Sequence, residues 1–321
     1  MGKLVEGEWK DVWYETTAHG GRFVRADSSF RDWVRADGST RYTPEAGRYH
    51  LYVSLACPWA HRTLIYRKLK GLEHAISVSV VDPLMASEGW ELDPNAEPGP
   101  VADATRLWEV YTRADPTYTG RVTVPVLWDR EHRTIVNNES SEIIRMFDEE
   151  FTGIADDSVS MRPMELRDEI DRLNDYIYPR INNGVYRCGF ATTQEAYEEA
   201  FGELFEALDT LDARLSTRRY LLGDRITEAD WRLFTTLVRF DAVYVGHFKC
   251  NRNRIADFEN LSGYLRDLYQ VSGVAETVSF DHIKQHYYRS HETINPSGVV
   301  PAGPRLDLDR PHERRNMEVA A

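Results

Sequence analysis

The residue best suited to chemistry in this sequence is the cysteine that opens the run Cys57-Pro58-Trp59-Ala60. Residues 49–55 before it are rich in aromatic and β-branched side chains, which is typical of a buried strand. After it, apolar residues recur at helical spacing over residues 60–72, and Gly71 lies where such a helix would end. Cys57 is therefore expected at the start of a helix, where N–H groups and the helix dipole lower the pKa of a thiol and favour the thiolate.

Ala60 stands three residues after Cys57, where a dithiol oxidoreductase would have its second cysteine. A mixed disulfide formed on Cys57 would then have to be released by an external thiol. The alternative is that Cys57 is a small buried hydrophobic residue after a strand. The strand, the proline and the helix around it favour the chemical interpretation.

The composition restricts the class of protein. A chain of 321 residues with 42% hydrophobic and 12% aromatic residues predicts a globular protein of two domains. Its net charge of −13 argues against nucleic acid and anionic membranes as partners. We find no apolar run as long as a membrane span and no apolar stretch of a signal peptide near the N-terminus, so we expect a cytoplasmic protein.

Neither a disulfide framework nor a metal site is predicted. The 3 cysteines are too few and too scattered for a framework, and Cys188 and Cys250 are interpreted as buried thiols. His282 and His286 share one face of a predicted helix, with His291 nearby. Because no acidic or cysteine ligand accompanies them at a familiar spacing, zinc is not expected.

The elements around Cys57 predict a small α/β domain. A second strand is expected at 75–83, followed by a long polar loop from 85 to 120, and loops of that length tend to be functional. Two further strands are expected at 122–129 and 134–136, and a helix begins after Asn138-Glu139-Ser140-Ser141. This order is that of a thioredoxin-like domain, which we place at 46–152. Residues 1–45 form an aromatic-rich N-terminal extension without a persistent pattern.

The second half of the chain predicts a helical domain. Apolar stripes at helical spacing begin near Arg162, and we place an α-helical bundle domain at 160–292, with a loop at 182–190. Thr227 and Asp230 have the spacing of a helix N-cap and its N3 partner, a structural signal without a catalytic role. Residues 293–321 are expected to form an extended C-terminal tail. The predicted fold class is thus α/β followed by all-α.

Three separated pieces fall at corresponding positions of the predicted α/β domain: Cys57, the Val124-Pro125 step and the Glu139-Ser140 pair. In this arrangement the sequence resembles a glutathione transferase. The resemblance implies that Pro125 is cis and that the backbone of Val124 pairs with the cysteinyl part of glutathione. It also implies that Glu139 binds the γ-glutamyl ammonium and that Ser140 binds the carboxylate. Taken alone, the two later pieces are as typical of a strand edge and a helix cap.

The likeness becomes more specific through four motifs: Cys57-Pro58-Trp59-Ala60, Glu88-Gly89-Trp90, Asn183-Gly184-Val185-Tyr186-Arg187-Cys188-Gly189-Phe190 and Ile283-Lys284-Gln285-His286-Tyr287-Tyr288. Together they resemble the xi-class glutathione transferases, the glutathionyl-hydroquinone reductases. The resemblance implies a homodimer in which Cys57 removes glutathione from a glutathionylated quinol. It further implies that tyrosines of the helical domain, Tyr186 and Tyr287 (with Tyr288 as the alternative to Tyr287), line the acceptor pocket. Trp90 and Arg121 would help to hold the tripeptide.

Several alternatives stay open at this point. A broader cysteine-type thiol transferase or dehydroascorbate reductase would share Cys57 and the thiol site, and a non-catalytic ligand-binding module is a third possibility. Ordinary packing would also account for any one of the 17 tyrosines. The composition is acidic and poor in lysine, which suits a salt-rich cytoplasm or a GC-rich genome. In the first case γ-glutamylcysteine would be an alternative to glutathione.

Overall fold

The computed structural model describes residues 2–93 and 99–314, and the chain forms two compact units. The sheet unit contains the described residues 2–13, 26–93, 99–160 and 277–292, and the helical unit contains residues 14–25, 161–276 and 293–314. Residues 277–292, which we had assigned to the helical domain, pack with the sheet unit because their helix lies against a strand of the sheet. The N-terminal extension contributes to both units. Residues 315–321 of the predicted tail lie outside the described residues.

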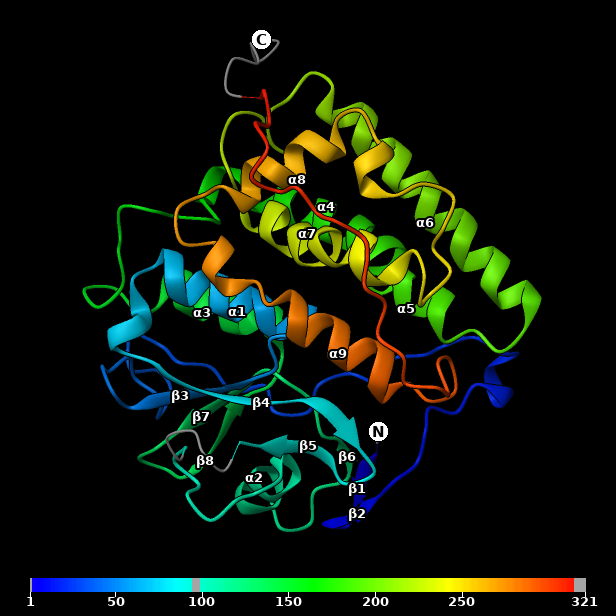
Figure 1. Ribbon diagram of the computed structural model, residues 1–321. Helices are drawn as coiled ribbons and strands as arrows, with labels where there is room; N and C mark the ends of the chain where they lie inside the picture. The colour runs from blue at the N-terminus through cyan, green and yellow to red at the C-terminus, as the bar shows by residue number, and fades with distance from the viewer. Residues whose placement is uncertain (1, 94–98, 315–321) are drawn as a thin grey trace. The chain divides into compact units, whose positions relative to one another are not determined.

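The sheet unit is built on five strands in the order β5-β4-β3-β7-β8 (Figure 1). The strands are β3 (Tyr49–Val53), β4 (Ser77–Ala86), β5 (Gly89–Leu92), β7 (Val126–Asp129) and β8 (Thr134–Asn137). β3 and β4 are parallel, and the other neighbours are antiparallel. Every residue of β3 is buried, as expected for a central strand that is covered on both faces.

Helices cover both faces of this sheet. α1 (Pro58–Leu69), α3 (Ser140–Glu149) and α9 (Phe280–Ser290) lie over one face, and α2 (Leu107–Ala114) lies over the other (Figure 1). The order of strands and helices confirms the predicted thioredoxin-like arrangement. α1 and α3 pack against each other, and Arg62 in α1 contacts Ser140 at the start of α3, so the two helices begin in one region of the unit.

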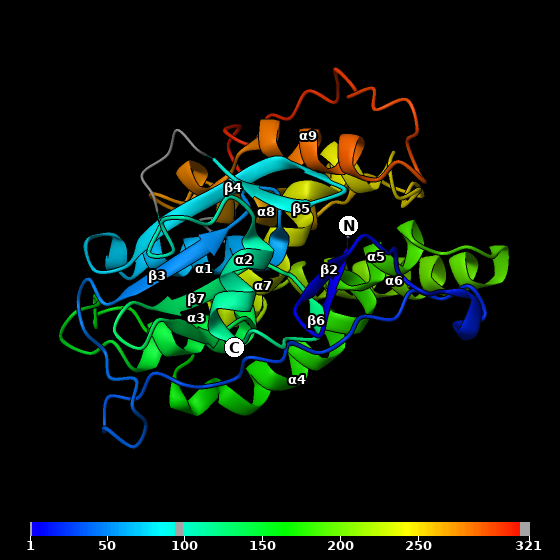
Figure 2. The ribbon, with the colours of Figure 1, turned by 90° about the horizontal axis from the view of Figure 1, so that it is seen from below.

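A short second sheet lies in the N-terminal extension, where we had found no strand pattern. β1 (Lys3–Val5) pairs with β2 (Glu8–Lys10) on one side and with β6 (Gly120–Arg121) on the other, as Figure 2 shows. The turn between β1 and β2 consists of Glu6 and Gly7, both with positive φ, as in a two-residue hairpin turn. Strands of two or three residues are too short to leave a periodic signal in the sequence.

The predicted polar loop at 85–120 is also wrong in part, since it contains β5 and α2. Glu109 accepts hydrogen bonds from the N–H groups of Thr105 (2.6 Å) and Arg106 (2.8 Å) and so caps the start of α2. Arg106 occupies the N-cap position, where a serine, threonine or aspartate would have indicated a helix start. The sequence therefore lacks the N-cap residue that usually indicates the start of a helix such as α2.

The helical unit contains α4 (Arg167–Ile177), α5 (Gly184–Gly189), α6 (Gln194–Leu215), α7 (Glu228–Arg239) and α8 (Leu261–Tyr269). Its predicted apolar stripes are buried, for example Ile170, Ile177, Leu204 and Leu208. The predicted loop at 182–190 is wrong, because α5 occupies most of it. Within the described chain, no helix has both the length and the apolar character that a bilayer span requires.

The C-terminal tail has no helix or strand over its described residues, 293–314, yet its end is anchored. The buried guanidinium of Arg314 donates to the carbonyl groups of Leu215 (2.9 Å) and Arg219 (3.0 Å), where α6 ends. Gln270, just after α8, donates to the carbonyl of Leu308 at 2.8 Å. Arg314 therefore satisfies the carbonyl at the end of α6, which would otherwise need water, and Gln270 holds the tail beside the end of α8.

A buried histidine in β3 makes the stability of the sheet unit depend on pH. His50 lies between the hydroxyls of Ser77 (2.7 Å) and Ser79 (3.0 Å), and burial, with a contribution from Arg130, lowers its pKa to about 3. The unfolded chain binds a proton near pH 6.5 and the folded chain does not, so stability is lost as the pH falls from 6.5 towards 3. The loss should approach about 1.4 kcal/mol per pH unit from this residue alone. Denaturant unfolding at several pH values measures it.

The control for this prediction is His74, which is exposed. His50→Gln should flatten the dependence of the unfolding free energy on pH between 4 and 6.5, whereas His74→Gln should leave it as in the parent. An equal slope in His50→Gln and the parent would contradict the assignment.

Candidate active site

Cys57 is the N-cap residue of α1, and Pro58 occupies the first helical position, as predicted. The carbonyl of Cys57 accepts the first helical hydrogen bond, from the N–H of His61 at 3.0 Å. Its half-buried sulfur lies 3.6 Å from the carbonyl oxygen of Val124, within reach of a thiol hydrogen bond. The Val124–Pro125 peptide is cis, as the resemblance implied. Two pieces far apart in the chain thus meet at the start of α1.

Tyr111 of α2 connects the second piece with the third, and sequence reasoning missed it. Its hydroxyl donates to the carbonyl of Thr123 at 2.8 Å and accepts from the side-chain amide of Asn138 at 3.1 Å. Burial raises the pKa of Tyr111 to about 12, so the phenol stays protonated and keeps both bonds. The Tyr111 side chain therefore holds Thr123, which precedes Val124, and Asn138, which precedes Glu139. Tyr111 and Asn138 are 27 residues apart in the sequence, so no local pattern indicates that they are in contact.

Glu139 and Ser140 begin α3. The carboxylate of Glu139 accepts from the N–H (2.9 Å) and the hydroxyl (2.8 Å) of Ser141, so Glu139 caps the helix. Its other oxygen accepts from the hydroxyl of Ser28 at 3.3 Å. The cap that we had considered as an alternative is therefore present. Binding of a γ-glutamyl ammonium by Glu139 stays a prediction.

Arg62 is a second residue that sequence reasoning missed. It lies on α1 and is 1% exposed, its guanidinium is 4.5 Å from the centre of the Trp59 ring, and one nitrogen donates to the hydroxyl of Ser140 at 3.3 Å. A buried cation at the N-terminus of α3 adds its charge to that of the helix dipole. Together they make this position favourable for a carboxylate.

Trp90 and Arg121 lie in the same unit as Cys57. Trp90 is buried and stacks on His286 of α9, with ring centres 4.8 Å apart. Arg121 donates to the carbonyls of Val12 (2.6 Å) and Trp13 (2.8 Å) and so holds the N-terminal segment. Both contacts are structural, and a role of either residue in thiol binding stays a prediction.

The two predicted substrate tyrosines belong to different units, which corrects the expectation that both come from the helical domain. Tyr287 lies on α9 in the sheet unit, is 1% exposed and contacts the edge of the His291 ring. Tyr288 beside it is also buried, and burial raises its pKa. Tyr186 lies on α5 in the helical unit and contacts Phe248 at 5.4 Å between ring centres.

Among the residues that the structure describes, one group of side chains has the spacing of metal ligands: ligand atoms of Asp129, Glu131 and His132 lie within 4.8 Å of one another. Arg48 donates to both carboxylate oxygens of Asp129, at 2.8 and 2.9 Å, and pairs with Glu131 at 2.8 Å. The cation that this group holds is thus an arginine side chain. The contacts are those of an ion-pair network in which the Arg48–Asp129 pair is buried and Glu131 is exposed.

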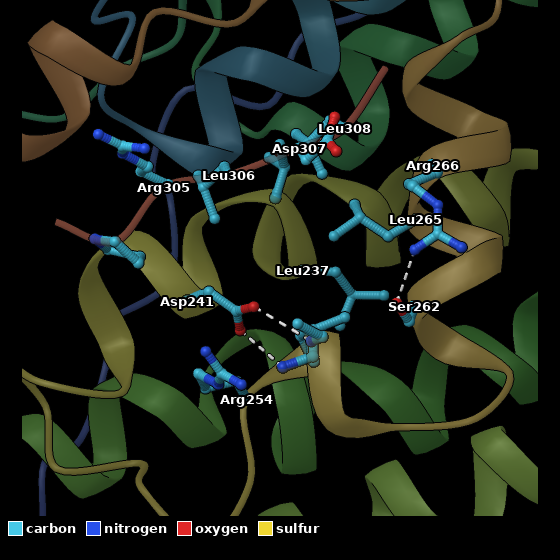
Figure 3. Close-up of a pocket in the computed structure, with 14 residues that line it drawn as sticks. Leu237, Asp241, Arg254, Ser262, Leu265, Arg266, Arg305, Leu306, Asp307 and Leu308 are labelled. Carbon is cyan, nitrogen blue, oxygen red and sulfur yellow. Dashed lines mark hydrogen bonds between the residues drawn. The ribbon is translucent and has the colours of Figure 1, made fainter. Parts of the chain in front are cut away.

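The pocket in Figure 3 lies within the helical unit and does not contain any predicted site residue. Its volume is about 80 Å³, whereas ligand sites are usually about 300–1,000 Å³. Asp241 in its wall accepts from the N–H groups of Ile255 (2.6 Å) and Ala256 (3.1 Å). This pocket is too small for an aromatic substrate, and its carboxylate has a structural role.

Comparison with known proteins places this chain among the glutathione transferases. The family model "Glutathione S-transferase, N-terminal domain" matches residues 56–150, and "Glutathione S-transferase, C-terminal domain" matches residues 194–267. Glutathionyl-hydroquinone reductase YqjG of Escherichia coli is 56% identical, with 98% of each chain covered. Glutathionyl-hydroquinone reductase PcpF of Sphingobium chlorophenolicum is 54% identical, with 96% of this chain and 98% of the relative covered.

Among solved structures, a xi-class glutathione transferase from Natrialba magadii is 56% identical, with a TM-score of 0.91 over 98% of this chain and 96% of that one. The chain belongs to the xi class of glutathione transferases. The glutathione-bound structure of Escherichia coli YqjG is also similar, with 53% identity, a TM-score of 0.88 and coverage of 97% and 98%. These comparisons confirm the family resemblance inferred from the four motifs. They also confirm the predicted fold class.

Proposed function

We propose that this xi-class transferase reduces S-glutathionyl-hydroquinones to hydroquinones, with Cys57 as the nucleophile and glutathione as the second thiol. The observation that carries the proposal is the position of the Cys57 sulfur, at the start of α1 and 3.6 Å from the Val124 carbonyl. Ala60 occupies the position of a resolving cysteine. The two relatives named as glutathionyl-hydroquinone reductases, at 56% and 54% identity, support the substrate class.

The proposed reaction has two steps. The Cys57 thiolate attacks the sulfur of the glutathionyl group, the sulfur–carbon bond to the ring breaks, and its electron pair passes to the aromatic ring. The ring carbon takes a proton, and the hydroquinone leaves, while Cys57 and glutathione are joined in a mixed disulfide. A second glutathione thiolate then attacks that disulfide, which yields oxidised glutathione and regenerates Cys57.

The binding roles follow from positions in the sheet unit. The N–H and C=O of Val124, before the cis Pro125, would pair with the cysteinyl part of the tripeptide. Ser140 and Arg62 at the start of α3 would receive the γ-glutamyl carboxylate, with Glu139 on its ammonium. Tyrosine has a hydroxyl donor on an apolar ring, so Tyr186 and Tyr287 are proposed to contact the quinol and to stabilise or protonate it.

The test is an assay of purified protein with an S-glutathionyl-hydroquinone and reduced glutathione, with the hydroquinone and oxidised glutathione separated by chromatography. We expect the two products in equal amounts. Faster turnover of dehydroascorbate than of the quinol conjugate would favour the broader reductase. Binding of the conjugate without any product would favour a non-catalytic module. Replacing glutathione with γ-glutamylcysteine in the same assay identifies the preferred thiol.

Arg62 provides a prediction about thiol binding. Arg62→Met should raise the KM for glutathione about 10- to 150-fold and change kcat little, because a cation beside the carboxylate contributes about 1.5–3 kcal/mol to binding in both ground and transition states. Steady-state kinetics with varied glutathione measure this split. Arg62→Lys keeps the charge and should lie between Arg62→Met and the parent.

The matched control is Lys68→Gln, which removes a cation from the last turn of α1. It should leave the KM for glutathione within about twofold of the parent. An unchanged KM in a folded Arg62→Met protein, as judged by circular dichroism, would remove Arg62 from the binding site.

Assembly and location also belong to the proposal. A homodimer and a cytoplasmic location stay predictions, the first from the family resemblance and the second from the sequence. Light scattering coupled to size-exclusion chromatography tests the dimer directly, since the monomer mass is 37.1 kDa.

A further inference from the structure

Arg25 lies on the face of Tyr186, in a segment to which the sequence analysis assigned no role. The centre of its guanidinium is 5.0 Å from the centre of the Tyr186 ring and 5.3 Å from that of the Phe23 ring. Both distances fall within the range of a cation–π contact. All three residues belong to the helical unit, so these contacts lie within one compact body.

Asn183 links the arginine to the tyrosine. Its side-chain oxygen accepts from Nε of Arg25 at 3.0 Å, and its main-chain carbonyl accepts from the N–H of Tyr186 at 3.0 Å. Asn183 is also the N-cap residue of α5, which carries Tyr186. One residue therefore sets the position of the guanidinium and of the helix turn beneath it. The first residue of the Asn183-Gly184-Val185-Tyr186 motif therefore has a structural role: it connects Arg25 with the turn that carries Tyr186.

The ring of Tyr186 is held on its other sides by aromatic residues. Its centre lies 5.4 Å from that of Phe248, 5.8 Å from that of Phe190 and 6.1 Å from that of Tyr244. The ring has little freedom, and its side chain is 8% exposed. In such apolar surroundings a single positive charge acts more strongly than it would in water.

We propose that Arg25 is a positioning residue for the reductive step, acting through Tyr186 to stabilise the negative charge that develops on the quinol. The inference rests on the proposed function, in which the Tyr186 hydroxyl meets a quinol oxygen. When the sulfur–carbon bond breaks, its electron pair enters the ring and is shared with that oxygen until the ring carbon is protonated. Arg25 and the Tyr186 hydroxyl stabilise this charge, which is absent from the bound substrate. The contribution therefore belongs to the transition state.

The first test is a double-mutant cycle in kcat. Arg25→Gln should lower kcat for the glutathionyl-hydroquinone about 10- to 100-fold with KM changed less than about threefold. In a Tyr186→Phe background the same substitution should cost less than about threefold, because the group through which Arg25 acts is gone. Arg25→Lys keeps the charge and should recover at least about a third of the parent kcat. Equal losses in both backgrounds, or equal losses for the Gln and Lys variants, would overturn the proposal.

The matched control is Arg22→Gln, in the same segment. Arg22 pairs with Glu199 on α6 at 2.6 Å and is exposed to solvent over 42% of its side chain. It should keep kcat within about twofold of the parent. A loss in Arg22→Gln as large as that in Arg25→Gln would show that the segment matters only for structure.

A second assay separates failure of this inference from failure of the proposed function. Reduction of a small aliphatic disulfide by glutathione uses Cys57 without developing charge on a ring, so Arg25→Gln should keep the parent rate in it. Parent protein that turns over the disulfide but not the glutathionyl-hydroquinone would refute the proposed function. Parent protein that turns over both, together with an Arg25→Gln variant of full activity, would refute the role of Arg25 alone.

Discussion

Cys57→Ala should abolish turnover of S-glutathionyl-hydroquinones, with kcat reduced at least about 10³-fold in a protein that stays folded. The sulfur is the atom that forms the mixed disulfide, and Ala60, at the resolving position, has no thiol to replace it. Cys57→Ser should be as inactive, because a hydroxyl does not form a disulfide. Product analysis by chromatography measures the loss, and circular dichroism checks the fold.

The controls are the other two cysteines, which are 2% and 0% exposed at Cys188 and Cys250. Burial raises the pKa of the Cys250 thiol well above its ordinary value, which keeps that sulfur protonated and unreactive. Cys250→Ala should therefore keep turnover within severalfold of the parent. After treatment with oxidised glutathione, intact-mass spectrometry should show one glutathione adduct, mapped to Cys57. An adduct found only on Cys188 or Cys250, or full turnover by Cys57→Ala, would refute the mechanism.

Asp230→Ala should lower the free energy of unfolding by about 3–5 kcal/mol, the largest effect on stability that we expect. Asp230 is fully buried, and its carboxylate accepts from the N–H of Thr227 (2.7 Å), the N–H of Leu221 (2.9 Å) and the hydroxyl of Tyr264 (2.8 Å). Removing it leaves these three donors buried without an acceptor. It also removes the N3 half of the capping box of α7, a helix in which every residue is buried.

Denaturant unfolding followed by circular dichroism measures this change. Asp224→Ala is the matched control, because Asp224 is exposed and lies six residues earlier in the same segment. It should change the free energy of unfolding by less than about 0.5 kcal/mol. Asp230→Asn keeps one acceptor oxygen and should fall between the two. A loss below about 1 kcal/mol in Asp230→Ala would show that the carboxylate does not hold α7 to its neighbours.

Elements with a local signal were predicted well. β3 is a run of five buried residues, α1 begins with a proline, and the Thr227–Asp230 capping box has the spacing of its hydrogen bonds. In each case the residues that define the element lie within a few positions of one another in the sequence. The missed elements, which include β1, β2, β5, α2 and α5, are short or lack a usual cap, so they owe their structure to the surfaces on which they pack.

The sequence by itself determined that Cys57 begins a helix, that Ala60 provides no second thiol, and, through four ordered motifs, to which family the chain belongs. These features depend on residue type and on spacings of a few residues. Only the tertiary structure decided which distant groups meet: the Val124 carbonyl with the Cys57 sulfur, and Arg62 with Ser140. It likewise placed Arg25 on the ring of Tyr186 and Tyr287 in the sheet unit. Such contacts arise because packing brings together side chains whose separation along the chain leaves no periodic pattern to detect.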